Sequence, residues 1–333
     1  RINGYDKLIE YSLKNHSTKR QTVLSFDEYR NRLISLALIK RGLYEAVTFS
    51  FLSKQDAQLY SENITPVVLD NPISEDLSVM RPSLLPNLIN NFIKNNNKGL
   101  KNSGLYEVGS VYLGDLDNEQ ILCSSGIRAG QVLARHWAVE PREFDIYDSK
   151  KDAYIALEAV GINTDSINLS KNVPKWYHPG RSASINLGKN LLGYFGELHP
   201  KYSESYGMRI VCFELFHNNI PKSNKKKINK EYISYSLMPV KRDFAFLTDI
   251  NTSADKIINS IKKSLSTLSN IKILAVNLFD VYSENLSSSE QKSLALEVIM
   301  QPTEKTLKDN EILEISNLII KGVEKDTNAI LRD

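Results

Sequence analysis

The residues between 176 and 200 include the side chains best suited to acid–base or metal chemistry. They are His178, Arg181, Glu197 and His199. Imidazole and carboxylate groups serve as zinc ligands and as general acids or bases. The same residues also have a structural interpretation, in which Arg181 and Glu197 form a cross-strand ion pair and each histidine precedes a turn-forming proline. A stand-alone enzyme using these four residues as an acid–base or metal site is the alternative function.

The element that must position these side chains is a predicted β-hairpin. Residues 182–187 alternate small or polar with apolar side chains, and residues 191–195 are apolar and aromatic. A short glycine-containing turn at 188–190 joins the two segments. With Lys189 at the tip, Arg181 faces Glu197 and Pro179 faces His199, so the four polar side chains gather at the open end.

Composition limits the class of protein. The chain has 333 residues, enough for two domains with separate cores, and its apolar fraction of 41% is ordinary for a soluble protein. Cys123 and Cys212 lie in apolar runs without metal-type spacing, which indicates reduced core thiols of a cytoplasmic protein. A net charge of +3 is too small to indicate a polyanionic partner, so any nucleic-acid affinity must come from a local patch.

Helices and hairpin-linked strands fill the region from about residue 20 to 217. A capping box at Ser25–Glu28 predicts the start of a helix that ends near Gly42, and a third helix is expected from a cap near Ser149 to Gly161. The remaining predictions are a helix at 84–97 and strands at 47–51, 105–113, 121–129 and 209–216, besides the hairpin. This mixture predicts an α+β domain built on an antiparallel sheet.

A basic linker separates this region from a second pattern. Residues 218–236 contain the lysines Lys222, Lys225, Lys226, Lys227 and Lys230. Beyond them, strands and helices are expected at 243–248, 254–268, 272–282, 293–301, 309–325 and 329–332. The order βαββαβ predicts a ferredoxin-like domain over 237–333.

Short motifs run in order along the chain. They are RIxGYD (1–6), NPIS (71–74), VMRPSLLP (79–86), YEVG (106–109), WYHPGRSA (176–183), GELHP (196–200), RDFA (242–245), FDVY (279–282) and KSLA (292–295). Jointly they resemble the C-terminal half of the β subunits of bacterial phenylalanyl-tRNA synthetases. The resemblance implies the end of an upstream winged-helix-like domain at 1–15, a non-catalytic class II synthetase-like domain at 20–217 and an anticodon-binding ferredoxin-like domain at 237–333.

The resemblance also implies a function. The chain would scaffold the catalytic α subunit in an α₂β₂ tetramer and bind the anticodon region of tRNA(Phe), as part of a phenylalanine–tRNA ligase. ATP and Mg²⁺ would be used by the complete complex. The family's editing site and acidic magnesium segment lie upstream of the position of Arg1, where the polar start without Met reads as a cut inside a longer chain. This chain is therefore expected to bind neither cofactor itself.

The expected lack of catalysis has a chemical reason. Class II synthetases place cationic groups on the ATP phosphates, where negative charge develops. In the strand that resembles motif 2 of the catalytic subunit, Ser110 and Leu113 stand where a cation is needed, and no glycine-rich helix carrying an arginine follows. Arg81 and Arg181 remain as phosphate ligands or as structural residues.

Two sets of residues are candidates for binding. The helix at 25–41 resembles motif 1 of the family, which forms subunit interfaces, and its candidate interface residues are Tyr29, Leu33, Leu36 and Lys40. The alternative is that this stripe, which continues through Ile34, Ala37 and Leu38, is buried within its own domain. In the last domain, aromatic stacking and basic contacts suit RNA. The candidates there are Lys241, Arg242, Tyr282, Lys292 and Arg332, whereas Phe244 and Phe246 are interpreted as core.

Overall fold

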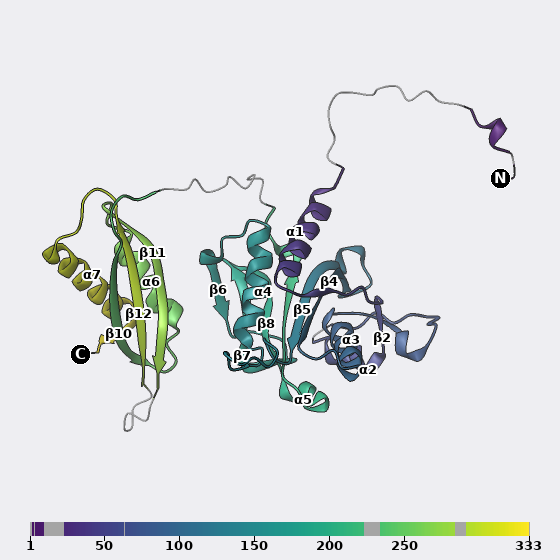
Figure 1. Cartoon of the computed structure of the whole chain (residues 1–333). Coiled ribbons are helices and arrows are strands. Elements are labelled where there is room, and N and C mark those ends of the chain that lie inside the picture. The colour runs from purple at the N-terminus through teal and green to yellow at the C-terminus, as the bar shows by residue number, and fades with distance from the viewer. Residues whose placement is uncertain are drawn as a thin grey trace. The chain divides into compact units, whose positions relative to one another are not determined.

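The computed structural model describes residues 2, 4–9, 23–62, 64–222, 234–283 and 291–332. The chain divides into two compact units, residues 1–227 and 228–333. Figure 1 shows a larger sheet with several helices in the first unit and a smaller sheet with two helices in the second. Among the described residues, no helix has the length and apolar composition needed to cross a membrane.

The first unit is built on a seven-stranded sheet. In spatial order its strands are β1 (Tyr44–Glu45), β4 (Ser103–Tyr112), β5 (Gln120–Ala129), β9 (Ile210–Phe216), β8 (Asn190–Leu198), β7 (Tyr177–Leu187) and β6 (Ile167–Ser170). Neighbouring strands run antiparallel, except that β1 pairs parallel with β4. The α+β prediction is confirmed, and β6 is a strand that the sequence did not predict.

Helices cover both faces of this sheet. The helices described in this unit are α1 (Phe26–Lys40), α2 (Lys54–Leu59), α3 (Leu85–Asn97), α4 (Ile146–Ala159) and α5 (Pro200–Ser203), with 3₁₀ turns at Tyr5–Lys7, Glu75–Leu77, Asp117–Glu119, Thr164–Ser166, Glu204–Tyr206 and His217–Asn219. Side chains of α1 and α4 share one core with Phe213 and Leu215 of β9, whereas α3 packs in another core with Cys212. This split follows from the alternation of side chains along β9. Both cysteines are buried free thiols, as predicted.

The predicted strand at 47–51 is wrong. Only Phe51–Leu52 (β2) is a strand there, paired with Val79–Met80 (β3), while Val47 and Phe49 are 91% and 72% exposed. The reason is that Thr48 bonds to a side chain instead of to a neighbouring strand. Its hydroxyl donates to Oε2 of Glu107 at 2.7 Å, and its backbone N–H donates to Oε1 at 3.3 Å.

The predicted cap of the third helix is also wrong. The helix α4 begins at Ile146, because the Asp145 carboxylate accepts bonds from the backbone N–H groups of Tyr147 and Asp148. Ser149 lies inside the first turn, where its hydroxyl donates to the Ile146 carbonyl at 3.0 Å. A serine hydroxyl in this position bonds to a backbone carbonyl of its own helix, so it does not act as the N-cap.

The hairpin β7–β8 has the predicted register only in its middle. Ser182 pairs with Gly196 and Ile185 with Gly193, but the register shifts towards the tip and again towards the open end, where Tyr177 pairs with Leu198. The predicted pairing of Pro179 with His199 is therefore wrong. Proline has no N–H to donate to the ladder, so the chain between 177 and 182 bulges away from β8.

The second unit has the predicted ferredoxin-like order of elements. They are β10 (Val240–Asp249), α6 (Ala254–Leu265), β11 (Ile271–Tyr282), β12 (Gln291–Pro302), α7 (Asp309–Thr327) and β13 (Ile330–Leu331). The spatial order is β11-β12-β10-β13, with antiparallel neighbours. The two helices and one sheet face share a core that includes Phe246, Leu296 and Ile319, each 0% exposed.

Candidate functional site

The sheet of the second unit has one face that α6 and α7 do not cover, which we call the open face. Along β10, Phe244, Phe246 and Thr248 are buried against the helices, so the alternate residues Ala245 and Leu247 lie on the open face. Ala245 pairs with Ala295 of β12, which places small side chains at its centre. A face of this kind leaves room for a ligand over the middle strands.

Tyr282 and Arg332 meet on the open face although they come from opposite outer strands. Tyr282 pairs with Ser293 at the end of β11, and the backbone N–H of Arg332, just after β13, donates to the Ala245 carbonyl at 2.7 Å. The Arg332 guanidinium lies 5.6 Å from the centre of the Tyr282 ring. Tyr282 is 39% exposed. An exposed tyrosine beside an arginine is the pair of groups on which unstacked bases pack.

The other three candidate RNA-binding residues lie on two different faces of the sheet. Lys241 is on the open face, with its Nζ 3.5 Å from Glu297 Oε1. Arg242 pairs across the sheet with the core residue Val298, so it lies on the helix-covered side. Lys292 is on that side too, because it pairs with the buried Thr248; its Nζ donates to the Ile250 carbonyl at 2.8 Å.

One basic residue of the open face was missed by the sequence analysis. Lys272 pairs with Gln301, on the same face as Tyr282, and its Nζ lies 5.6 Å from the centre of the Tyr235 ring. Two register shifts in β11, at 273–275 and 278–280, separate Lys272 from Tyr282. Each shift inserts one residue in β11, so the two cancel, and simple alternation over the ten residues also places Lys272 and Tyr282 on one face.

The linker lysines fall mostly outside the described residues. Lys222 is described, and its Nζ lies 5.7 Å from the centre of the Phe26 ring. Lys225, Lys226, Lys227 and Lys230 lie outside the described part of the chain.

The candidate interface residues of α1 lie on the side of the helix turned away from its own core. Tyr29 and Leu36 are 54% and 44% exposed, Lys40 is exposed and Leu33 is half-buried. Ile34, Ala37 and Leu38 face the sheet and are buried. The predicted stripe thus divides between two environments, and its outer part is an apolar surface without a partner among the described residues.

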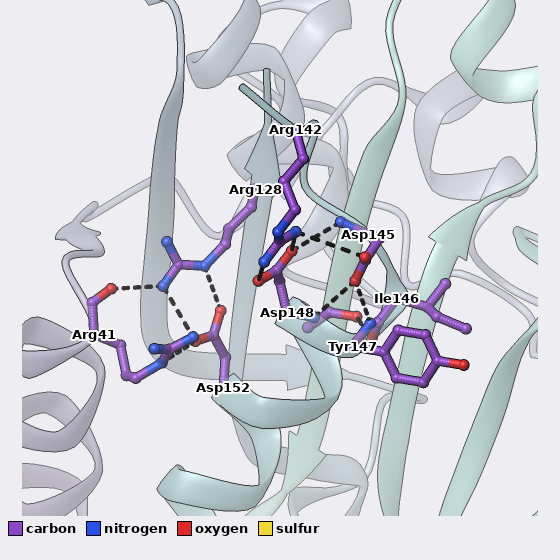
Figure 2. Close-up of polar contacts among 9 residues, drawn as sticks. Arg41, Arg128, Arg142, Asp145, Ile146, Tyr147, Asp148 and Asp152 are labelled. Atoms are coloured by element: carbon purple, nitrogen blue, oxygen red, sulfur yellow. Dashed lines mark hydrogen bonds and ion pairs between the residues drawn. The ribbon is translucent and has the colours of Figure 1, made fainter. Parts of the chain in front are cut away.

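Carboxylates neutralise several arginines of the first unit. Figure 2 shows that Arg128 and Arg41 share the carboxylate of Asp152, and their Nε atoms lie 2.5 and 2.8 Å from its two oxygens. In the same view, two nitrogens of Arg142 donate to the two oxygens of Asp148 at 2.7 and 2.9 Å. Guanidinium groups held in bidentate and shared pairs of this kind have fewer N–H groups left for a phosphate.

Arg81, a candidate phosphate ligand, is likewise engaged. It is 3% exposed, its Nη1 lies 2.8 Å from Glu107 Oε1, and its Nε donates to the Ser110 carbonyl at 2.9 Å. A cation buried in this way cannot reach a triphosphate without breaking an ion pair. The residues present at this position therefore do not fit ATP.

The histidine cluster of the hairpin shows local structural contacts. Arg181 Nε lies 2.8 Å from Glu197 Oε2, as expected for the ion pair, and Arg209 Nε lies 3.6 Å from the same oxygen. The Nδ1 atoms of His178 and His199 accept hydrogen bonds from the backbone N–H groups two residues later along the chain. The centres of the two imidazole rings are 6.5 Å apart. Within the described ranges no three metal-ligating side chains form a group able to hold an ion.

Two family models match the chain. The first, described as the phenylalanyl tRNA synthetase beta chain CLM domain, matches residues 9–216. The second, a ferredoxin-fold anticodon binding domain, matches residues 236–332.

Curated relatives match over the whole chain. The phenylalanine–tRNA ligase beta subunits of Paramagnetospirillum magneticum and Bartonella quintana are each 37% identical over 100% of this chain. The chain spans 42% of the length of each of these relatives. Among solved structures, the pyrrolysyl tRNA synthetase PylSc of Desulfitobacterium hafniense aligns with a TM-score of 0.45 and 16% identity, over 58% of this chain and 64% of that chain.

Proposed function

The chain belongs to the phenylalanyl-tRNA synthetase beta-chain family, and on this premise we propose that it is the C-terminal part of a cytoplasmic phenylalanine–tRNA ligase β subunit. Its first unit scaffolds a catalytic α subunit in an α₂β₂ tetramer, and its second unit binds the anticodon region of tRNA(Phe). The observation that carries this proposal is the order of the two family matches, at 9–216 and 236–332, which together cover nearly the whole chain.

The proposal assigns the chemistry of aminoacylation to the α subunit. ATP and Mg²⁺ are used by the complete complex, and the first unit of this chain serves as a structural scaffold for the α subunit. The neutralised arginines of the first unit support that division, because phosphate binding requires available guanidinium groups. The exposed side of α1 supports the scaffold role, since an apolar helix face on a soluble domain is stabilised when a partner covers it.

For the RNA contact we propose the open face, with Tyr282, Arg332 and Lys241 as its members. The proximity of the Tyr282 ring to the Arg332 guanidinium supports a base-stacking platform. Arg242 and Lys292, on the other side of the sheet, remain predictions.

Co-expression with a catalytic α subunit tests the function. The two chains should co-purify, and the complex should charge tRNA(Phe) in an ATP-dependent reaction, whereas either chain alone should not. Failure to associate would contradict the scaffold role. Saturable ATP turnover by the isolated 333-residue chain would contradict the division of labour.

A further inference from the structure

A cavity of about 450 Å³ lies in the first unit, on the sheet face that α3 covers. Four aromatic side chains line it: Tyr60, Trp176, Tyr194 and Phe216. They stand in two pairs, with ring centres 5.5 Å apart for Tyr60 and Trp176 and 5.7 Å apart for Tyr194 and Phe216. The volume and the aromatic walls are those of a small-molecule site.

A buried carboxylate forms part of the same wall. Glu214 lies on the central strand β9 and is 2% exposed. Three neutral groups donate to it: Ser83 Oγ at 2.5 Å, Trp176 Nε1 at 3.2 Å and Tyr177 Oη at 3.2 Å. A carboxylate accepts about four hydrogen bonds, so one acceptor position remains.

Glu214 has no basic partner in the described part of the chain. No lysine, arginine or histidine there lies within 4.0 Å of its oxygens, and none lines the cavity. The other acidic wall residue, Glu62, is paired with Lys175 at 3.2 Å. Ser83 accepts from the Leu85 N–H at the start of α3, which adds only the partial charge of a helix end. Burial without a counter-ion raises the pKa of Glu214, and a cation bound beside it would offset the cost of its ionised form.

We propose that this cavity binds a small monocationic amine, whose ammonium group meets Glu214 while its apolar or aromatic body packs against the four rings. Aromatic faces attract cations, so the walls and the carboxylate favour the same ligand. The absence of a basic side chain from the described walls disfavours phosphates and free amino acids, whose anionic groups would find no cationic partner. This site goes beyond the scaffold and RNA-binding roles and does not depend on them.

Tryptophan fluorescence provides a direct test. The chain has two tryptophans, so Trp137→Phe leaves Trp176, in the cavity wall, as the reporter. Titration of the full chain with phenethylamine should change the Trp176 emission saturably. Hydrocinnamate, which replaces the amine with a carboxylate, and L-phenylalanine, which carries both groups, should bind far more weakly.

Variants separate the carboxylate from general apolar binding. In the same background, Glu214→Gln should weaken phenethylamine binding by about ten-fold or more, because it removes a charge-assisted hydrogen bond. Glu143→Gln, which changes an exposed glutamate outside the cavity, should leave the affinity unchanged. No saturable signal, equal binding of phenethylamine and hydrocinnamate, or unchanged affinity in Glu214→Gln would each overturn the proposal. If Glu214→Gln does not fold, the ligand comparison in the parent background decides alone.

Discussion

At the scale of single residues, His217 shows how burial fixes a protonation state. It is 0% exposed, its Nε2 and Nδ1 lie 3.1 Å from Ser124 Oγ and 3.0 Å from Asn31 Oδ1, and its carbonyl accepts from Arg30 Nη2 at 2.9 Å. Burial, with Arg30 beside it, lowers the pKa of His217 from 6.5 to about 3. The ring therefore stays neutral in the folded chain at pH values where the unfolded chain binds a proton.

This difference makes stability depend on pH. Between pH 6.5 and 3 the unfolded state holds the additional proton, so the free energy of unfolding falls as the pH is lowered. At pH 5 the loss from this residue is about 2 kcal/mol. Urea unfolding followed by tryptophan fluorescence should show the stability advantage of wild type over His217→Gln shrinking by that amount between pH 7 and 5. An advantage independent of pH would contradict the lowered pKa.

The ion pairs of Figure 2 predict a second residue-scale effect. Asp152 is 1% exposed and serves both Arg128 and Arg41. Asp152→Ala should lower the free energy of unfolding by about 3–5 kcal/mol, because it leaves a buried guanidinium without a partner. Glu143→Gln, which breaks an exposed pair with Arg209, is the control and should cost less than about 1 kcal/mol. Similar losses in both variants would show that the buried pair has no special role.

At the scale of elements, α1 has two faces with different roles. Leu38 is 0% exposed and Leu36 is 44% exposed, although they are two residues apart. The helical period of 3.6 residues separates them by about half a turn. The side facing the sheet stabilises the fold, and the outer side is available to a partner.

The two leucines form a matched pair of tests. Leu36→Asp should leave the isolated chain folded, with a change of about 1 kcal/mol or less, and should abolish co-purification with the α subunit. Leu38→Asp should unfold the first unit, because it buries a carboxylate in the core. Circular dichroism and pull-down measurements distinguish the two results. If Leu36→Asp co-purifies normally, this face is not the interface.

The sheet of the second unit permits a similar comparison of faces. Arg332 lies on the open face beside Tyr282, and Arg242 lies on the helix-covered side. Arg332→Ala and Tyr282→Ala should each weaken tRNA(Phe) binding by about ten-fold, since stacking contributes about 1–3 kcal/mol per base. Arg242→Ala removes the same charge and should have a smaller effect. Filter binding at fixed salt measures the difference, and equal losses for the two arginine variants would argue against a face-specific contact.

At the scale of the whole molecule, the two units have separate cores. Both tryptophans, at 137 and 176, belong to the first unit, so fluorescence reports its unfolding alone. Phe246 is 0% exposed in the core of the second unit. Two units with separate cores need not unfold in a single transition.

Core mutation of the second unit tests this independence. Phe246→Ala should destabilise that unit by about 3–5 kcal/mol and move part of the circular-dichroism transition to lower urea. The fluorescence transition of the first unit should keep its midpoint. A parallel shift of both signals would show that the units unfold together.

The sequence by itself determined the features that depend on local patterns. The capping box at Ser25–Glu28 and the ion pair between Arg181 and Glu197 follow from spacing within a short segment. The order βαββαβ of the second unit follows from the pattern of each of its elements in turn. Family membership followed from motifs spread along the chain, each of which is short and contiguous.

Only the tertiary structure decided which residues come together from distant segments. Thr48, expected in a strand, binds the Glu107 carboxylate instead, and the bulge at Pro179 breaks the expected pairing of that proline with His199. The pairing with Gln301 of β12 places Lys272 on the open face. In the sequence, Glu214 is a single acidic residue within an apolar strand. The structure brings Ser83 and Trp176 to its carboxylate, where both donate hydrogen bonds. The pairs that form join residues distant in the sequence, and no local period or propensity encodes which partner a side chain finds.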